Sequence, residues 1–360
     1  MMTDILREPL CPWQTEKSPY ADVVMSSHIR LVRNMQGLAF PHRADAAALK
    51  QVLQAGKERL GALDAIGHGT YEYVSLGDLT ALEREQLVLH QLSTASHIAV
   101  PDQRALLIRE DGAAVVMMNE DDHFVIETHA AGLALQRVWD DAAQMDDALE
   151  QAINFAFRDD FGYLTTSPSL TGTGLIAGVT VHIPAIVAMK RLNRIVQGIT
   201  KFGFAIGSLY GQGSETPGNL FEITNQITLG VSESDILEQL RRLVLQIIQE
   251  ERNCRAILWS HDKSRWIDRF FRAYGLLTYA TRMSEGEALR LISDLRLGID
   301  FDVLREQPVV HAALLHVVEP AFLQGRAEAL PISEDDMLQA RAKAVHQVLK
   351  TYEVAPSSVS

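Results

Sequence analysis

The feature that most constrains the fold is an apolar run that ends in a row of carboxylates, between residues 115 and 126. The run Val115–Met118 has the apolar, partly β-branched composition of a buried strand. The next four residues, Asn119–Asp122, include three acidic side chains and no lysine or arginine, so repulsion among them raises at least one pKa. Two interpretations remain open for this stretch. It is either a solvated turn of a hairpin, or a strand end that presents a proton acceptor or a cation-binding group beside a cleft.

The patterns around this stretch predict an α+β fold, with a largely antiparallel sheet and helices packed on it. Alternation in Ser26–Asn34 predicts a short strand that presents basic side chains. Apolar runs at 105–108 and 113–118 predict two strands joined by the turn Glu110–Gly112. Continuous alternation of strands and helices is lacking, which argues against a parallel sheet. Helical spacing of apolar residues recurs at 45–63, 83–92, 135–157 and in the segment that follows the capping residue Ser232.

The length of the chain indicates more than one domain. At 360 residues it exceeds the usual size of a single core, so we expect one large domain and a smaller one. We place a small, mostly helical N-terminal domain at residues 1–92 and a larger domain at residues 93–353. The remaining residues, 354–360, are expected to form a disordered tail.

Charge and cysteine content argue against several classes of function. A net charge of −13 disfavours binding to nucleic acids or anionic membranes, which needs a concentrated basic face. With only Cys11 and Cys254, the chain has neither a disulfide framework nor a zinc site built from several cysteines. The first residues do not form a signal peptide, and no apolar run approaches the roughly 18 residues that span a bilayer. We therefore expect a cytoplasmic protein.

Generic catalytic motifs are missing from the sequence. No GxxxxGK[ST] occurs, and Gly172–Gly178 misses the GxGxxG spacing by one residue. No HExxH motif occurs, and scattered histidines such as His123, His129 and His182 are more often structural residues than ligands. We therefore expect no metal site formed by the protein alone.

Several stretches together resemble a known family. Their order and spacing, over about residues 20–350, are similar to those of the phosphagen kinase superfamily, and within it to the McsB-type protein-arginine kinases. The stretches are Ser26–Arg30, Asn119–His123, Ser167–Gly174, Tyr210–Glu215 and Asn225–Gly230.

This resemblance implies a fold, an activity and partners. It implies a small helical N-terminal domain and a larger domain whose antiparallel sheet is flanked by helices. Active members transfer the γ-phosphoryl group of ATP, with Mg²⁺, to a guanidinium nitrogen of arginine in a protein. The resemblance also implies a McsA-like activator, a CtsR-like repressor and a ClpC-like unfoldase as expected partners. A homodimer is a separate possibility.

The resemblance further assigns roles to individual positions. Asp121 and Glu120 are the candidate base and guanidinium-binding carboxylates. Ser27, Arg30 and Gly207 match retained positions of the nucleotide motifs.

The sequence departs from the family at the positions that hold phosphate and guanidinium groups. Four family arginines are replaced, by His28, Val125, Ile176 and Ile206. A family histidine is replaced by Gln91, and a family acidic residue is replaced by Gln212. We call these six the degenerate positions.

These departures lead to two hypotheses of different classes. The first is a pseudokinase: a McsB-like homologue with impaired or lost phosphotransfer, which acts in protein quality control or stress regulation through protein contacts and needs no cofactor. The alternative is an active ATP-dependent protein-arginine kinase with a rebuilt phosphate site. One cationic contact to a transferring phosphoryl group is worth about 10³–10⁵ in rate, so the loss of several favours the first hypothesis.

Overall fold

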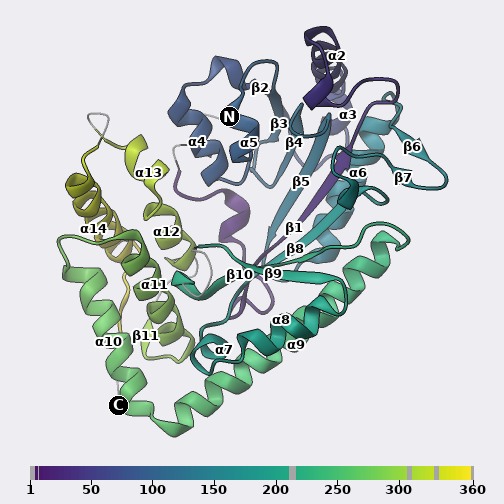
Figure 1. Ribbon diagram of the computed structural model, residues 1–360. Helices are drawn as coiled ribbons and strands as arrows, with labels where there is room; N and C mark the ends of the chain where they lie inside the picture. Colours follow the sequence, from purple (N-terminus) through teal and green to yellow (C-terminus); the bar gives the residue numbers. More distant parts are fainter. Residues whose placement is uncertain (1–4, 7, 211–215, 306–309, 328–331, 358–360) are drawn as a thin grey trace.

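The structure is a computed structural model and describes residues 5–6, 8–210, 216–305, 310–327 and 332–357. Its centre is an eight-stranded sheet in the order β2-β3-β4-β5-β1-β8-β10-β9, with antiparallel neighbours throughout. The predicted α+β fold with an antiparallel sheet is therefore confirmed (Figure 1). The strands are β1 (Val24–Arg33), β2 (Tyr71–Ser75), β3 (Ala105–Arg109), β4 (Ala114–Met118), β5 (Phe124–Ala131), β8 (Leu175–His182), β9 (Phe204–Ser208) and β10 (Leu220–Asn225). Two short hairpin-like pairs are β6 (Phe157–Arg158) with β7 (Gly162–Tyr163) and β11 (Leu304–Arg305) with β12 (Ala355–Pro356).

Helices pack on both sides of this sheet. The first group is α2 (Ala46–Lys57), α3 (Leu60–Asp64), α4 (Ala81–Leu89), α5 (Ala95–Ala99), α6 (Leu135–Glu150), α7 (Pro184–Ala188), α8 (Leu192–Thr200) and α9 (Glu233–His261). The C-terminal group is α10 (Lys263–Tyr279), α11 (Glu285–Asp300), α12 (Val310–Val317), α13 (Pro320–Gly325) and α14 (Glu334–Thr351). Among the helices of the described residues, none is long and apolar enough to cross a membrane.

Strand β1 lies in the middle of the sheet and separates two chemically different faces. It pairs with β5 on one side and with β8 on the other. Because side chains alternate along a strand, Ile29 and Leu31 point to one face while His28 and Arg30 point to the other. Both apolar residues are fully buried. The predicted strand and its two faces are thus confirmed.

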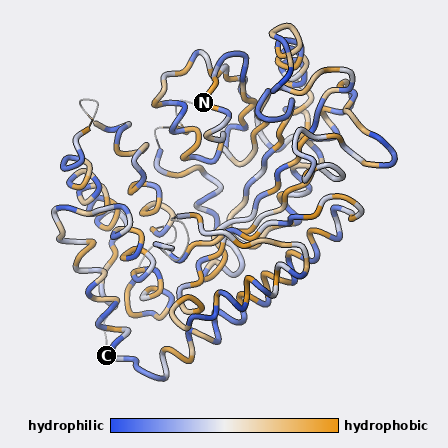
Figure 2. The backbone as a smooth tube through the Cα atoms, viewed as in Figure 1, coloured by the Kyte–Doolittle hydropathy of each residue, from blue (hydrophilic) through white to orange (hydrophobic). Residues whose placement is uncertain are grey.

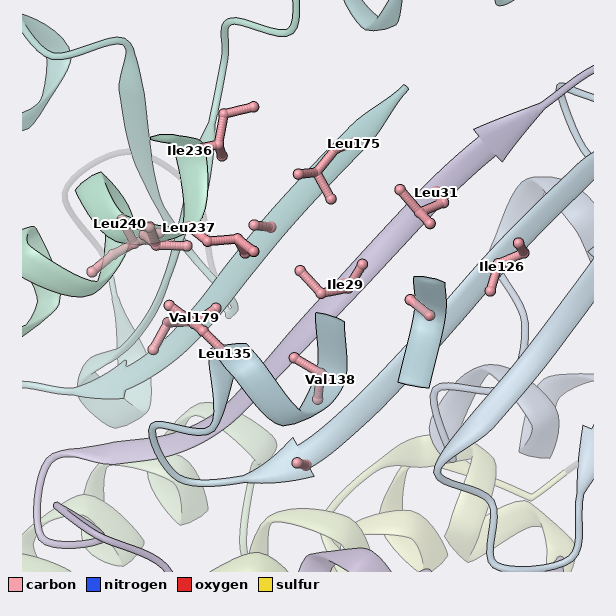
Figure 3. Close-up of a cluster of buried hydrophobic side chains, with 14 of the residues drawn as sticks. Ile29, Leu31, Ile126, Leu135, Val138, Leu175, Val179, Ile236, Leu237 and Leu240 are labelled. Carbon is pink, nitrogen blue, oxygen red and sulfur yellow. The ribbon is translucent and has the colours of Figure 1, made fainter. Parts of the chain in front are cut away.

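The apolar face of the sheet is covered by α6 and α9. Figure 3 shows Ile29 of β1 near Val138 of α6 and Leu31 further along the same strand, with Leu237 of α9 beside the neighbouring strand β8. Helix α9 begins as the sequence predicted, because the Ser232 hydroxyl accepts a hydrogen bond from the backbone N–H of Asp235. Hydrophobic and hydrophilic residues alternate along α9 (Figure 2), so one side packs on the sheet and the other faces solvent.

The opposite face of the sheet is covered by two different parts of the chain. Over β3, β4 and β5, the segment around Trp13 and helices α4 and α5 enclose a second apolar core, which includes Leu87 and Val125. Helices α10 to α14 form a further core of their own. In Figure 1 these C-terminal helices stand beside the sheet, away from α6.

Two of the predicted domain limits lie within segments that the structure describes. Strands β1 and β2, from the first 92 residues, belong to the same sheet as the later strands, so residue 92 marks no boundary within the sheet. The reason is that the partners of β1 lie far along the chain, where local patterns carry no information about them. Within the segment expected to form the tail, Val354 is buried and Ala355 pairs with Arg305. Residues 358–360 lie outside the described residues.

Candidate active site

The carboxylate row forms the turn between β4 and β5, and Asn119 fixes its shape. Asn119 has a φ of 59°, a left-handed conformation that asparagine tolerates better than most residues. Its side-chain Nδ2 donates hydrogen bonds to the carbonyl oxygens of Leu49 and Gln103, at 3.0 and 2.8 Å. The stretch is therefore the turn of a hairpin, but it is not the solvated turn of the first interpretation, because Asn119, Glu120 and Asp122 are buried and only Asp121 is exposed.

Asp122 and His123 are also structural. The Asp122 carboxylate accepts hydrogen bonds from Asn34 Nδ2 and from the backbone N–H of Thr166, both at 2.6 Å. His123 Nδ1 accepts a hydrogen bond from the backbone N–H of Met35 at 3.0 Å, so its proton sits on Nε2, 3.0 Å from the Ala39 carbonyl oxygen. Burial lowers the pKa of His123 and keeps the ring neutral. These two side chains therefore support the turn.

Glu120 is a buried, strongly held carboxylate. It accepts hydrogen bonds from Thr94 Oγ1 at 2.7 Å and from Ser96 Oγ at 2.8 Å, and it forms an ion pair with Arg30 at 3.1 Å. Burial alone favours the neutral acid, but the Arg30 charge, the Asp121 backbone N–H and these two hydroxyls outweigh it. Together they lower the pKa of Glu120 to about 2. Glu120 is consequently ionised at any physiological pH.

Asp121, the candidate base, differs from Glu120 in its surroundings. It is exposed, and its carbonyl oxygen accepts a hydrogen bond from Thr166 Oγ1. Partial desolvation, followed by the negative charges of Glu120 and Asp122, raises the pKa of Asp121. The direction agrees with the predicted repulsion within the row, and desolvation is the larger cause. Adjacent carboxylates whose pKa values are pushed in opposite directions are the arrangement from which acid–base sites are built.

Arg30 stands between two carboxylates. Its Nη2 lies 3.1 Å from Glu120 and its Nη1 lies 3.6 Å from Glu127 of β5. On its other side β8 places Ile176 opposite it, so no charge comes from that strand at this register. The retained family arginine is therefore already neutralised by two neighbours.

A cavity of about 1310 Å³ lies on the same face of the sheet. It is bounded by the sheet, the segment around Trp13, helices α4 and α5, and helices α12 and α13. His28, Glu127, His129 and Glu222 line it from the sheet side. His28 Nε2 lies 3.7 Å from Glu222, and His129 Nε2 lies 3.6 Å from Glu127. The sheet thus presents imidazoles and carboxylates to this cavity.

The degenerate positions do not all meet at this cavity. His28 and Gln91 line it, and Ile176 lies beside Arg30 on the same face. Val125 is fully buried in the second core instead. Ile206 lies opposite Ile223 and packs against the helix-covered face. Those last two positions are therefore not exposed slots of one phosphate site.

The retained positions are divided as well. Gly207 lies opposite Glu222 on the cavity side of the sheet, with open space where a Cβ would be. Ser27 points to the other face, where its hydroxyl donates to the Gly132 carbonyl oxygen at 2.7 Å and accepts from the Ala134 N–H at 3.0 Å. Ser27 therefore ties β1 to the start of α6 and is not placed to touch a nucleotide. Gln212 lies outside the described residues.

Sequence reasoning missed the residues that give this site its charge. Glu127 follows Val125 by two positions and so lies on the same side of β5, and Glu222 alternates with buried Phe221 and Ile223 in β10. Both could have been noticed as single charges on otherwise apolar strands. Thr94 could not, because it approaches Glu120 from a segment distant in sequence.

The described residues also limit which cofactors fit. Within them, no group of three or more His, Cys, Asp or Glu side chains could hold a metal ion. A nucleotide triphosphate carries about four negative charges and needs cations around it when it leaves water. On this face Arg30 is already paired, and the cavity lining has five glutamates against the two cations Lys17 and Arg296, so the described lining does not fit a triphosphate.

Comparison with known proteins gives two family matches. Residues 53–254 match the ATP:guanido phosphotransferase C-terminal catalytic domain. Residues 263–358 match the protein-arginine kinase McsB C-terminal domain. Together the two matches span most of the chain.

Curated relatives are similar over nearly the whole length. Protein-arginine kinase from Halothermothrix orenii is 35% identical over 324 residues, which cover 90% of this chain and 92% of the relative. The one from Symbiobacterium thermophilum is 38% identical over 334 residues, covering 90% and 93%. The one from Bacillus subtilis is 35% identical over 320 residues, covering 89% and 88%.

Solved structures share the fold. The duplicated taurocyamine kinase from Schistosoma mansoni, with bound transition-state-analogue components, superposes with a TM-score of 0.59 at 24% identity. This match covers 69% of the present chain but only 35% of that duplicated one. Lombricine kinase superposes with a TM-score of 0.58 at 20% identity, covering 68% and 69% of the two chains. At these identities the likeness concerns the fold alone.

Proposed function

Since the chain belongs to the protein-arginine kinases of the ATP:guanido phosphotransferase family, we propose that it is a member with impaired or lost phosphotransfer. Members of this family use ATP with Mg²⁺. In this chain the fold is retained for contacts with other proteins, in quality control or stress regulation in the cytoplasm. An activator of the McsA type, a repressor of the CtsR type and an unfoldase of the ClpC type are the partners to test first.

This proposal rests on one observation: the positive charge of Arg30 is already paired with carboxylates of the same chain. Arg30 contacts both Glu120 and Glu127, and the next strands add Glu222 with a histidine beside it. Phosphoryl transfer depends on cations that neutralise the developing charge on the phosphate oxygens. A face where carboxylates outnumber free cations raises the free energy of a bound triphosphate.

A second candidate, the active protein-arginine kinase, is favoured by a different observation. Glu120 and Asp121 keep two carboxylates side by side, one with a lowered pKa and one with a raised pKa. Such a pair is suited to bind a guanidinium and accept its proton. The two proposed functions therefore differ mainly in whether the site can bind the phosphates of ATP, and less in whether its carboxylates can bind a guanidinium.

Calorimetric titration with ATP and MgCl₂ separates these two candidates. We expect no saturable binding below about 1 mM ATP, which corresponds to a binding free energy weaker than about −4 kcal/mol. The Bacillus subtilis relative serves as the comparison protein. A dissociation constant in the low micromolar range, weakened in Arg30→Ala, would overturn the proposal.

A phosphotransfer assay gives the second readout. The unmodified chain is incubated with ATP, Mg²⁺ and a casein-like substrate, and phosphoarginine is read by mass spectrometry under conditions that spare the acid-labile P–N bond. We expect at most a trace. Robust phosphorylation that disappears in Asp121→Ala would establish the active kinase instead.

A further inference from the structure

The lining of the cavity beside β1 is rich in carboxylates. Among the residues that the structure describes, five glutamates line it and only two cations, Lys17 and Arg296. The glutamates come from the N-terminal segment, α4, the sheet and the segment before α13, and they are Glu16, Glu85, Glu127, Glu222 and Glu319. The cavity therefore has a negative potential that disfavours anions and favours cations.

Two buried histidines in the cavity lining have ring nitrogens without hydrogen-bond partners. His129 Nε2 and both ring nitrogens of His311 lack a partner within the described ranges, and these residues are only 5% and 2% exposed. Burial is the main cause that lowers the pKa of each ring, to about 4 for His129, so both are neutral and each offers a nitrogen acceptor. A buried acceptor without a donor is costly, and a ligand N–H would satisfy it.

The two glutamates from the sheet are too far apart to share one cationic group. Glu127 belongs to β5 and Glu222 to β10, which are separated by β1 and β8, or about 14 Å across the sheet at the usual strand spacing. The register adds an offset of four residues along the strands, because Glu127 lies opposite Arg30 and Glu222 lies opposite Thr180, the partner of Ser26. The rings of His28 and His129 stand between them, with centroids 6.0 Å apart. A ligand that neutralises both carboxylates must therefore carry positive charges at separate points.

Apolar side chains form another part of the lining. They include Val88 and Leu89 of α4, Ile98 of α5 and Leu315 of α12. Such surfaces suit methylene groups and disfavour a fully polar ligand.

We propose that this cavity binds a linear aliphatic polyamine, with ammonium groups at Glu127 and Glu222 and its methylene chain along the apolar wall. The ammonium N–H groups also supply the donors that His129 and His311 lack. A triphosphate has the wrong charge for this cavity. A single guanidinium or ammonium group reaches only one of the two carboxylates.

This inference depends on the shape and charge of the cavity and not on loss of phosphotransfer. The test titrates the full-length chain with spermidine, by calorimetry at pH 7.5 and low salt, where carboxylate–ammonium attraction is least screened. We expect one spermidine per chain, and binding at least tenfold weaker in Glu127→Gln/Glu222→Gln. The matched control Glu238→Gln, on the exposed side of α9, should bind as the unmodified chain does.

Three further arms make the outcome decisive. L-arginine ethyl ester, with separate guanidinium and ammonium groups too close to span both glutamates, should bind at least tenfold more weakly than spermidine. If the double variant does not fold, Glu222→Gln alone is used, because that side chain is 39% exposed and tolerates the change.

Two outcomes would overturn the proposal. One is equal affinity of the glutamine variant and the unmodified chain for spermidine. The other is several weak sites per chain, as expected for non-specific binding to an acidic protein. The ATP titration is scored separately, so this proposal and the proposed function can fail independently.

Discussion

Replacement of Glu120 by glutamine tests whether the ion pair with Arg30 is an integral part of the fold. Glu120 is 3% exposed, contacts Arg30 at 3.1 Å and accepts hydrogen bonds from Thr94 and Ser96. Glutamine keeps the size of the side chain but removes its charge. It also turns an amide N–H₂ group toward the guanidinium or the hydroxyls, where acceptors are needed.

The expected cost follows from the pKa of Glu120. Its folded value, about 2, lies below the usual 4.5, so ionised Glu120 stabilises the folded state above pH 4.5 and this contribution disappears as pH falls toward 2. Since one pKa unit corresponds to about 1.4 kcal/mol, the gap is worth about 3 kcal/mol at most. We expect Glu120→Gln to lower the free energy of unfolding at pH 7 by about 2–3 kcal/mol.

Urea denaturation at several pH values measures this effect. The difference in unfolding free energy between the unmodified chain and Glu120→Gln should be full at pH 7 and should shrink between pH 4.5 and 3. Glu238→Gln, an exposed control, should stay within about 0.5 kcal/mol of the unmodified chain. Equal stability of the two proteins at pH 7, or a difference that does not change down to pH 3, would refute the reasoning.

Two further substitutions test the packing around β1. Arg33 is 2% exposed and pairs with the buried carboxylate of Asp146 at 2.7 Å, so Arg33→Met should lower the free energy of unfolding by about 3–5 kcal/mol. Arg33→Met/Asp146→Leu should recover most of that loss in urea denaturation, and no recovery would contradict the account. Gly178→Ala would place a Cβ 2.0 Å from His28 Cε1 and should cost about 1–3 kcal/mol. Because His28→Ala removes the obstacle, the pair of changes should melt higher than Gly178→Ala alone, and a lower melting temperature would argue against the clash.

Local patterns predicted the elements of this fold well. Alternation gave β1, apolar runs gave β3 and β4, and a capping serine gave the start of α9, because each depends on residues close in sequence. The turn with Glu120 and Asp121 was also found, since its residues are contiguous. The domain limit placed at residue 92 took no account of the distant partners of β1, which join strands from both sides of that residue in one sheet.

The faces of the sheet were harder to predict than its strands. Ser27, Val125 and Ile206 match motif positions in sequence, yet β1 turns Ser27 toward α6, Val125 lies in the second core, and β9 turns Ile206 toward the helix-covered side. A motif gives the order of residues, whereas the register of paired strands decides which face each side chain reaches. The partners of Arg30 depend on the same register, so its ion pair with Glu127 was not predicted from the sequence.

The central place of β1 has a consequence for how the chain is made. Ile29 pairs with Thr128 and Ala177, which are 99 and 148 residues further along the chain. At about 5–20 residues per second, a ribosome needs roughly 7–30 s after β1 before the second of these partners exists. Throughout that interval the strand carries its buried residues with an unpaired edge, the kind of edge that joins to other chains. Nascent chains halted before residue 175 should therefore aggregate or engage chaperones, and refolding of the complete chain should be slow because these contacts close such long loops.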